Sequence, residues 1–371
     1  MLKVCHATSV HKSTDTRIFH KQCVSLANAG YDVFLVASGE SYESCGVKII
    51  GVPQNTGGRL KRMVHGAKAV YKKALEIDAD IYQIHDLELL PYALKLKKKG
   101  KIVIFDSHEN YTLLISTKYY LPGLFRTLVA KLYHLYETRV CKEIDAVIVP
   151  CKINNISSFE NRAKQVVFID NTPILDELYV KYTPDYCKRK NSICYVGGLT
   201  YERGVSNVVK AAHLANAKLI LAGEFSPANY YDEIKALNEY SCVEYRGFVN
   251  RENYIEILNE CRVGVCTILN TGQYNSADNL ATKVYEYMAM GLPAIVSDYS
   301  YAEKVNEKYK CFKLVNPDDI EEIANAINYL LDNPEIAEDM GQNGRRAVIE
   351  EFNWNLEEKK LLRIYESLAE A

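Results

Sequence analysis

Short apolar runs alternate along the chain with longer segments whose apolar residues recur at helical spacing. Apolar runs of this length predict buried strands, and their alternation with helical segments is typical of parallel α/β sheets. One helix, for example, is expected from Ile18 to Ala29, ended by Gly30. The predicted strands are residues 3–9, 32–38, 47–53, 81–85, 102–108, 146–150 and 165–170 in the first half, and 192–198, 218–223, 243–248, 263–268, 294–298 and 311–315 in the second.

A polar segment that contains Pro173 and Pro184 separates the two series of strands. It predicts a boundary between two doubly wound, Rossmann-like domains, residues 1–172 and 173–352. The last segment, about residues 353–371, has helical period and is either a plain terminal helix or one that crosses back over the first domain. Ligands of doubly wound sheets bind beyond the carboxyl ends of the strands, so we expect the active site in a cleft between the domains.

Charge is unevenly distributed along the chain. Residues 1–150 contain 21 Lys and Arg against 14 Asp and Glu, whereas the remainder contains 24 against 33, within a net charge of −2. The basic residues of the first half are interpreted either as solvated helix faces or as a surface that docks an anionic partner.

The cysteines and the apolar runs indicate a compartment. Eleven cysteines, with no C-x-x-C pair, favour neither a disulfide framework nor a zinc site, and are interpreted as buried thiols in a reducing cytoplasm. Met1 leads through Lys3 into a predicted strand without a signal-peptide pattern, and no run approaches the roughly 18 apolar residues that cross a bilayer. We expect a cytoplasmic protein whose membrane contact, if it has any, is peripheral.

A glycine pair follows one strand in "YVGGLTYERGV". Gly197 and Gly198 allow close approach of a ligand to the backbone, and Arg203 stands in the first turn of the following helix, where the helix dipole disfavours a cation. The turn either only closes a strand-helix unit or binds an anionic phosphate.

A second phosphate-binding element is predicted in "DNLATKVYEYMAMGLPAIVSD". Asp278 and Asn279 are expected to cap a helix that starts near Ala281, which leaves first-turn N–H groups facing a ligand. Lys283 and Glu286 are neighbours on one helix face, either as a local ion pair or as parts of a diphosphate site with the Gly-Gly turn.

Histidines end several predicted strands of the first half: His6, His85 and His108. One such histidine is typically structural, but three at neighbouring strand ends favour the wall of a cleft. In the loop "SVHKSTDTRIFHK", Asp15 is a helix cap or a ligand contact, and Arg17 has no equally simple structural role.

No metal or redox-cofactor motif is present. Asp86 and Glu88 follow His85 without a second carboxylate cluster, and the first strand-turn-helix lacks G-x-G-x-x-G. We therefore expect no metal and no cofactor.

Taken together, "SVHKSTDTRIFHKQCVSLANAGYDVFLVA", "IYQIHDLELLPYAL", "IFDSHEN", "YVGGLTYERGV", "YRGFV" and "KVYEYMAMGLPAIVSD" resemble the retaining glycosyltransferases of family four. The resemblance spans nearly the whole chain, and the members it points to are those that act in the synthesis of bacterial surface polysaccharides. It implies the GT-B fold, with two Rossmann-like domains facing across a cleft, an acceptor domain first, a donor domain second, and a C-terminal helix that returns to the first domain.

The resemblance also implies roles for individual residues. Glu286 is the carboxylate that holds the donor ribose, and Asp278 occupies the position of a second carboxylate, with a shorter side chain than the family's Glu. Gly198 stands where the family has an Arg, so Lys283 is expected to supply the missing charge beside Arg203. The implied catalytic residues are His85, Arg203, Lys283 and Asp278. The implied donor-binding residues are Gly197, Gly198, Arg203, Gly223, Glu224, Phe248, Asn279, Leu280, Ala281, Lys283 and Glu286. The acceptor side is assigned to Asp15, Arg17, His108 and Glu109.

The implied reaction is a metal-independent, retaining transfer of a sugar from a nucleoside diphosphate sugar, with a UDP-sugar favoured, to a glycan or polyprenyl-diphosphate-linked acceptor.

The helical segment "STKYYLPGLFRTLVAKLYHLYETR" is either core packing with a solvated face or a contact with an anionic inner membrane leaflet. No nucleic-acid partner is expected. The alternatives are a nucleotide-sugar epimerase of the same fold, with Asp106 and Glu109 as acid and base, or a catalytically silent subunit of a transferase.

Overall fold

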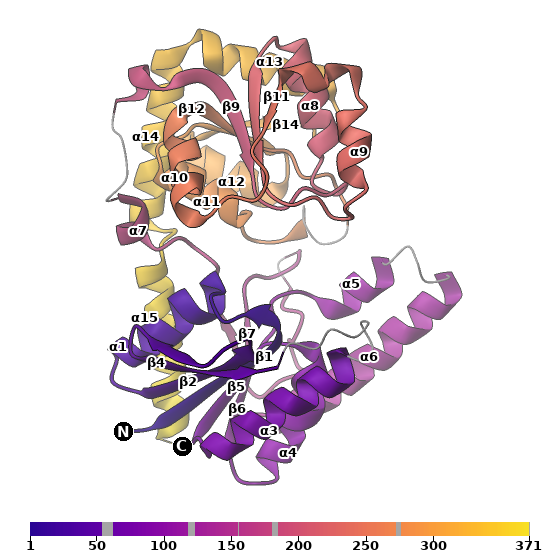
Figure 1. The fold of residues 1–371 in the computed structure, drawn as a ribbon, viewed down its shortest axis with the longest axis vertical. Coiled ribbons are helices and arrows are strands. Elements are labelled where there is room, and N and C mark those ends of the chain that lie inside the picture. The colour runs from indigo at the N-terminus through magenta and orange to yellow at the C-terminus, as the bar shows by residue number, and fades with distance from the viewer. Residues whose placement is uncertain (54–61, 118–122, 155, 180–184, 272–275, 371) are drawn as a thin grey trace. The chain divides into compact units, whose positions relative to one another are not determined.

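The computed structural model describes residues 1–53, 62–117, 123–154, 156–179, 185–271 and 276–370. The chain forms two compact units, Met1–Asn171 with Asn355–Ala371, and Thr172–Trp354. Each is an α/β unit built on a largely parallel sheet (Figure 1), which confirms the predicted fold class.

The first unit has an eight-stranded sheet in the order β3-β4-β2-β1-β5-β6-β7-β8. All neighbours are parallel except β3 and β4. The chain reverses its direction of winding between β1 and β5, and ligands of such sheets bind beyond the carboxyl ends of the strands at this point. The strands are β1 (Lys3–Lys12), β2 (Asp32–Ser38), β3 (Tyr42–Ser44), β4 (Val47–Val52), β5 (Ile81–Ile84), β6 (Ile102–Asp106), β7 (Ala146–Val149) and β8 (Val166–Phe168).

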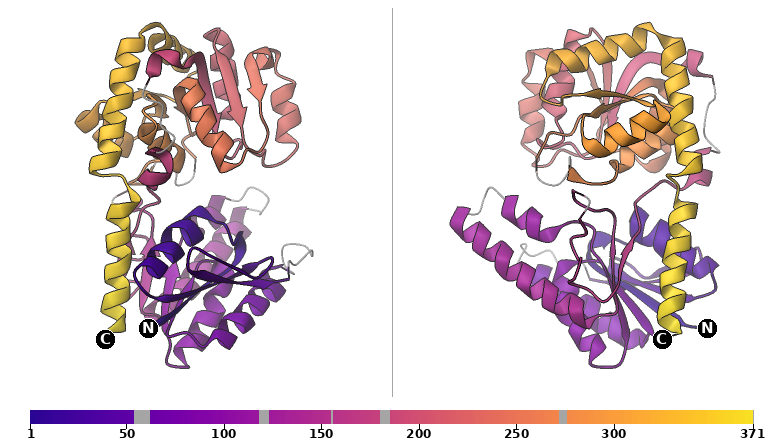
Figure 2. Two further views of the ribbon diagram at one scale, coloured as in Figure 1. Left: turned by 60° about the vertical axis from the view of Figure 1, so that its left-hand side comes forward. Right: turned by 180° about the vertical axis from the view of Figure 1, so that it is seen from behind.

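Helices cover both faces of this sheet. Cys5 and Ala7 of β1 point into a core with α3, α4 and α6, whereas His6, between them, points to the face covered by η1 and α15. Figure 2 shows α15, in yellow, running beside the strands of this unit. The helices are η1 (Thr16–Cys23), α1 (Val24–Asn28), η2 (Arg62–Gly66), α3 (Ala67–Ile77), η3 (Leu87–Leu89), α4 (Leu90–Lys97), α5 (Tyr111–Thr117), α6 (Gly123–Glu143) and α15 (Trp354–Ala369).

The second unit has a six-stranded parallel sheet in the order β11-β10-β9-β12-β13-β14. Its winding reverses between β9 and β12, so the carboxyl end of β9 lies at the position where ligands bind. The strands are β9 (Lys190–Val196), β10 (Lys218–Ala222), β11 (Val243–Tyr245), β12 (Cys261–Cys266), β13 (Ala294–Ser297) and β14 (Phe312–Val315).

Alternate residues of these strands fill two separate cores. Cys194 and Val196 of β9 pack with α10, α11 and α12, whereas Ile193 and Tyr195 pack with α8 and α13. This alternation with helices on both faces explains why the strands read as continuous apolar runs. The helices are α7 (Leu175–Tyr179), η4 (Tyr186–Lys188), α8 (Val205–Leu214), α9 (Tyr230–Lys235), η5 (Asn238–Cys242), α10 (Arg251–Glu260), α11 (Thr282–Ala289), α12 (Ser300–Tyr309), α13 (Ile320–Asp332) and α14 (Pro334–Glu350).

All thirteen predicted strands are present, and the short antiparallel strand β3 was not predicted. β3 is three residues long and largely exposed, so its hydrophobic pattern gives no signal. Among the described residues, no helix combines the length and the apolar character that crossing a membrane requires.

Candidate active site

Three glycines shape the carboxyl edge of the second sheet. Gly197 and Gly223 have φ angles of +126° and +140°, and a β-carbon on Gly223 would lie 1.8 Å from the carbonyl oxygen of Gly197. The Gly223 N–H donates to the carbonyl of Gly247 over 2.7 Å. Only glycine fits at position 223, and the backbone turns after β9 and β10 are therefore locked against each other.

Two cationic side chains lie against the Gly-Gly turn. A β-carbon on Gly197 would lie 3.3 Å from Nζ of Lys283, and one on Gly198 would lie 3.2 Å from Nη1 of Arg203. The structure thus brings together Gly197, Gly198, Arg203 and Lys283, which lie up to 86 positions apart in the sequence. The missing side chains of the two glycines are what leave room for the cations.

The amine of Lys283 is buried without a hydrogen-bond partner among the described residues. Its Nζ lies 3.5 Å from the centroid of the Tyr195 ring, on β9. Burial lowers the pKa of Lys283 to about 7, and the positive charge of Arg203 acts in the same direction. Of the two alternatives for this helix face, the local ion pair with Glu286 is not formed, so this amine is available to an anion.

The start of α11 differs from the predicted one. The N-cap residue is Ala281, with extended backbone (φ −60°, ψ 138°) and no side-chain hydrogen bond. The prediction that Asp278 and Asn279 cap this helix is therefore wrong. The Leu280 N–H donates to the Tyr285 hydroxyl over 3.2 Å, and the Asn279 carbonyl accepts from Tyr299 over 2.9 Å. Asp278 lies half-buried in the bend before the helix.

Glu286 is held by two residues that have no role predicted from the sequence. Arg251 places Nη1 2.7 Å from Oε1 of Glu286, and the Tyr254 hydroxyl donates to Oε2. Arg251 also binds Glu177 through Nε at 2.6 Å, so its own position is fixed. Both contacts orient a carboxylate that is 10% exposed, and its remaining lone pairs can accept hydrogen bonds from a ligand.

The other residues predicted for the donor lie at neighbouring strand ends. Glu224 is exposed and directly follows Gly223, and its carbonyl accepts from the Leu199 N–H over 3.0 Å. Phe248 directly follows Gly247 and is 70% exposed, an unusual state for a phenylalanine. An exposed aromatic ring beside the glycine turns provides a surface on which a planar base can stack.

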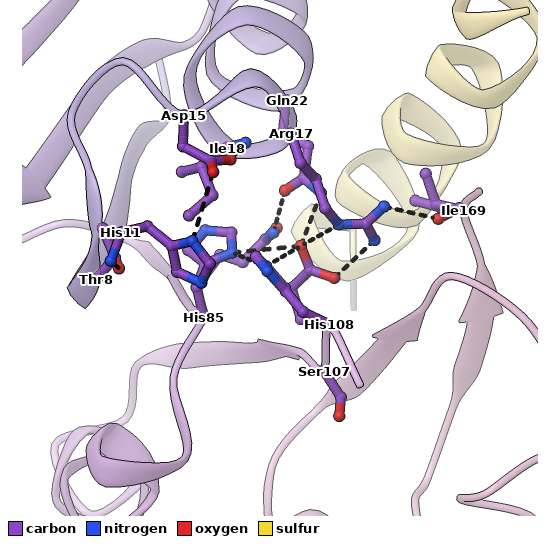
Figure 3. A network of polar contacts seen from close by, with 12 residues as sticks. Thr8, His11, Asp15, Arg17, Ile18, Gln22, His85, Ser107, His108 and Ile169 are labelled. Carbon is purple, nitrogen blue, oxygen red and sulfur yellow. Dashed lines mark hydrogen bonds and ion pairs between the residues drawn. The ribbon is translucent and has the colours of Figure 1, made fainter. Parts of the chain in front are cut away.

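In the first unit, His11, His85 and His108 gather at the carboxyl ends of β1, β5 and β6 (Figure 3), and His6 lies further back on β1. His85 contacts His6 through Nε2 at 3.0 Å and His108 through Nδ1 at 3.2 Å. The ring of His11 packs on that of His108, with centroids 4.7 Å apart. His6 and His85 are fully buried, and burial lowers the pKa of both; His108 and His11 are the members that reach the surface.

The buried carboxylate of Asp106 anchors this cluster. Arg17 binds it with two nitrogens, Nη2 to Oδ1 at 2.8 Å and Nε to Oδ2 at 3.1 Å, and Gln22 donates to Oδ2 over 2.7 Å. Despite complete burial, the charge of Arg17 and the neighbouring His108 and His85 hold the pKa of Asp106 well below its usual value. The third Arg17 nitrogen donates to the Ile169 carbonyl over 3.0 Å.

This arrangement corrects the role assigned to Arg17. The side chain is 6% exposed and all its nitrogens are engaged inside the unit, so Arg17 fixes Asp106 instead of facing an acceptor. Asp15 takes its predicted structural role, because it accepts from the Ile18 N–H over 2.9 Å and caps η1. The same carboxylate lies 3.4 Å from His11.

Asp86 and His11 complete the cluster, and neither has a site role predicted from the sequence. Asp86 accepts from the hydroxyl of Thr8 over 2.8 Å and the N–H of Ser9 over 2.6 Å, and lies 3.5 Å from His11. Burial lowers the pKa of His11, but the hydrogen bond to Asp15 and the charge of Asp86 outweigh burial and raise this pKa above its usual value. Glu109, at the same edge, is half-buried, and its carbonyl accepts from Ser107 over 3.0 Å.

Among the described residues, His85, Asp106 and His108 bring three metal-ligand atoms within 4.8 Å. A divalent cation there would have to displace the Arg17 guanidinium and the Gln22 amide from Asp106, and to separate two hydrogen-bonded rings. The residues fit a hydrogen-bonded cluster better than a metal site. Because Arg17 and Gln22 already bind the Asp106 carboxylate, Asp106 is also unsuited to act as the acid or base of an epimerase.

Two family models match the chain. "Glycosyl transferases group 1" matches residues 186–347, and "Glycosyltransferase Family 4" matches residues 16–153. The alpha-maltose-1-phosphate synthase of Mycolicibacterium smegmatis is 28% identical over 195 residues, 48% of this chain and 48% of that protein. The chain spans only 20% to 48% of the length of the curated relatives it matches.

Solved structures share the fold over the whole chain. Sucrose-phosphate synthase from Thermosynechococcus elongatus superposes with a TM-score of 0.75 at 16% identity, over 99% of each chain. Anabaena HepE in complex with UDP and glucose superposes with a TM-score of 0.72 at 14% identity, over 100% of each chain. The two matches, which together take in most of the chain, place it in the family-four glycosyltransferases, and it has the GT-B fold.

Proposed function

We propose that this glycosyltransferase moves a sugar from a nucleoside diphosphate sugar to a glycan acceptor, with retention and without a metal ion. The observation that carries the proposal is the buried amine of Lys283, which lacks a hydrogen-bond partner among the described residues and lies beside Arg203 and the Gly-Gly turn. An unpaired buried amine costs stability, and such a group is typical of a site that binds an anion.

The chemistry explains why a diphosphate is the proposed anion. Negative charge builds on the diphosphate as the bond to the sugar C1 breaks, and Lys283 and Arg203 stabilise that charge. Two fixed cations supply what a metal ion supplies in other transferases. The acceptor hydroxyl approaches the face that the diphosphate leaves and gives its proton to the departing phosphate, so no enzyme nucleophile is required.

The remaining donor contacts follow from neighbouring residues. Glu286, held by Arg251 and Tyr254, accepts hydrogen bonds from the ribose hydroxyls, and Phe248 stacks on the base. We favour UDP as the nucleotide, a choice supported by the fold shared with HepE, whose structure contains UDP and glucose.

A thermal-shift panel of UDP, GDP, ADP and their sugars, with EDTA present, tests the donor. A ligand at 100 times its dissociation constant stabilises its protein by about 2.7 kcal/mol. We expect UDP and one UDP-sugar to raise the melting temperature in EDTA, and then to support transfer to a glycan. If no nucleotide raises it, the proposal fails.

We also propose that the acceptor is a membrane-borne precursor, such as a polyprenyl-diphosphate-linked glycan of a surface polysaccharide. On α6, Leu128, Leu132 and Leu135 are 53%, 58% and 67% exposed, and their i, i+4, i+7 spacing places them on one face. Arg139 and Lys142, both exposed, continue that face at the same spacing. An exposed apolar stripe next to cations suits an anionic bilayer surface.

Flotation with vesicles tests this membrane contact. We expect the protein to float with vesicles that contain phosphatidylglycerol at low salt, and Leu132→Asp to abolish this. Ile349→Asp is the matched control, since Ile349 is 51% exposed on α14 and outside the stripe. Equal flotation of wild type and Leu132→Asp would contradict the proposal.

All eleven cysteines are free thiols, which supports a reducing compartment and hence the cytoplasmic face.

A further inference from the structure

A closed chain of hydrogen bonds on one face of the first sheet connects the C-terminal helix to the histidine cluster. The Tyr365 hydroxyl of α15 lies 2.7 Å from Oε1 of Gln83, Nε2 of Gln83 lies 2.5 Å from Oε1 of Gln22, and Nε2 of Gln22 lies 2.7 Å from Oδ2 of Asp106. All four side chains are fully buried. Because they are buried, none of them contacts a ligand directly, and this series of hydrogen bonds requires another explanation.

The ionised carboxylate fixes the direction of every bond in this chain. Asp106 is bound by the two-pronged contact of Arg17 and can only accept hydrogen bonds. The amide nitrogen of Gln22 must therefore face it, because the opposite orientation would place two oxygens 2.7 Å apart. It follows that Gln83 donates to Gln22, and that the Tyr365 O–H donates to Gln83.

The phenol then fixes the proton of His6. Tyr365 has one proton, which Gln83 receives, so towards His6 its oxygen can only accept. Nε2 of His6 lies 3.3 Å from that oxygen and is accordingly the protonated nitrogen. Burial lowers the pKa of His6 well below its usual value, so the ring is neutral and its Nδ1 carries a lone pair.

The same logic passes to the next two rings. Nε2 of His85 lies 3.0 Å from Nδ1 of His6 and must donate to it. Burial lowers the pKa of His85, so this ring is neutral as well and its Nδ1 carries a lone pair. That lone pair lies 3.2 Å from Asp106, an acceptor, and 3.2 Å from Nε2 of His108. Only His108 can bring a proton to this point, so its Nε2 is protonated and its Nδ1 is an acceptor. No described residue is a hydrogen-bond partner of this Nδ1, and the ring is 14% exposed.

We propose that Tyr365 is a positioning residue, which fixes the tautomers of His6, His85 and His108 so that Nδ1 of His108 accepts a hydrogen bond from a sugar hydroxyl. The sugar rests on the proposed function, whereas the tautomers rest on the hydrogen-bond geometry and on the neutral state of the buried rings. Tyr365 acts through Gln83, 282 positions away in the sequence, and through His6, 359 positions away.

Nitrogen-15 NMR of the histidine rings tests the tautomers without any substrate, because protonated and bare ring nitrogens have well-separated shifts. His6→Asn and His85→Asn assign the signals. In the wild type we expect His85 protonated on Nε2 only. In Tyr365→Phe, His6 loses the acceptor of its Nε2 proton and Gln83 loses its donor. We therefore expect the rings of His6 and His85 to change tautomer. A wild-type His85 protonated on Nδ1, or unchanged tautomers in Tyr365→Phe, would overturn the proposal.

Tyr31→Phe is the matched control, since the Tyr31 ring packs edge-on against Tyr365, with centroids 5.8 Å apart, outside the hydrogen-bonded chain. It should leave the tautomers and the transfer rate unchanged. We expect kcat/KM of Tyr365→Phe to fall about fivefold, the typical cost of one hydrogen bond between neutral groups. Unchanged kcat/KM with altered tautomers would overturn the assigned role of His108. Absence of any wild-type transfer would instead contradict the proposed function, and the NMR result would still decide the tautomers.

Discussion

The amine of Lys283 lies over the ring of Tyr195, 3.5 Å from its centroid, on the strand that ends at the Gly-Gly turn. The ring face attracts the charged form of the amine by about 0.5–2 kcal/mol, without using a hydrogen bond. This contact positions the cation and leaves its N–H donors for a ligand. The proposed donor site is therefore arranged before the diphosphate binds.

Arg203→Ala should reduce transfer far more than it reduces stability. The guanidinium lies against Gly198, and losing a charged hydrogen bond to the leaving diphosphate costs about 1.5–3 kcal/mol, or a factor of roughly 10 to 150 in kcat/KM. Steady-state kinetics measure this. Arg346→Ala, at an exposed position of α14, is the control and should match the wild type. Unchanged kcat/KM in Arg203→Ala would remove Arg203 from the mechanism.

Glu286→Gln should remove the discrimination between UDP and its deoxy forms. If Glu286 accepts from a ribose hydroxyl, the wild type binds 2′-deoxy-UDP or 3′-deoxy-UDP more weakly than UDP by about 1.5–3 kcal/mol. The variant binds UDP weakly and the deoxy nucleotide with little further loss. Calorimetric titration gives all the affinities. Discrimination that survives in the variant would show that another group holds the ribose.

Asp106→Asn should destabilise the first unit. It leaves the Arg17 guanidinium buried without its counter-ion, and breaking a buried pair typically costs about 3–5 kcal/mol. Urea unfolding measures the loss. Asp32→Asn is the control, because Asp32 pairs with Lys48 at the surface and an exposed pair contributes about 0–1 kcal/mol. Equal effects of the two variants would contradict the anchoring role of Asp106.

Nucleotide binding should weaken with rising pH. The pKa of Lys283 in the free protein is about 7. A bound diphosphate favours the charged amine and raises this pKa, so binding takes up a proton above pH 7. The affinity for UDP then falls by about tenfold per pH unit between roughly pH 7.5 and 9.5. Calorimetry in buffers of different ionisation enthalpy measures the proton directly. A pH-independent affinity would mean that Lys283 does not sense the phosphate.

The fold was predictable from the sequence because its strands are buried on both faces. β9 is apolar from Ile193 to Val196 and β13 from Ala294 to Val296, for example, and the pattern identifies them without any tertiary information. The cap at Asp15 was also predictable, since it depends on residues three positions apart. The Gly-Gly turn, Arg203 and Lys283 could be named from residue types, but their contacts depend on three separate strand-helix units.

The parts that could not be predicted depend on long-range pairings. Arg17 and Asp106 are 89 positions apart, so nothing near Arg17 indicates that its charge is neutralised inside the unit. The start of α11 was mispredicted because Ala281 takes the N-cap position in place of the polar residues before it. Arg251 was missed as the partner of Glu286, although the cap at Asn250 places it in the first turn of α10.

Lys283→Met provides the most direct test of the central claim, that a buried amine without a protein partner binds the diphosphate. Without nucleotide, removing it should raise the free energy of unfolding by about 1–3 kcal/mol, because an unsatisfied buried group is lost. UDP affinity, measured by calorimetry at pH 7, should fall by at least about tenfold. Lys304→Met, at an exposed position of α12, should change neither. A Lys283→Met protein that binds UDP as tightly as the wild type would contradict the account.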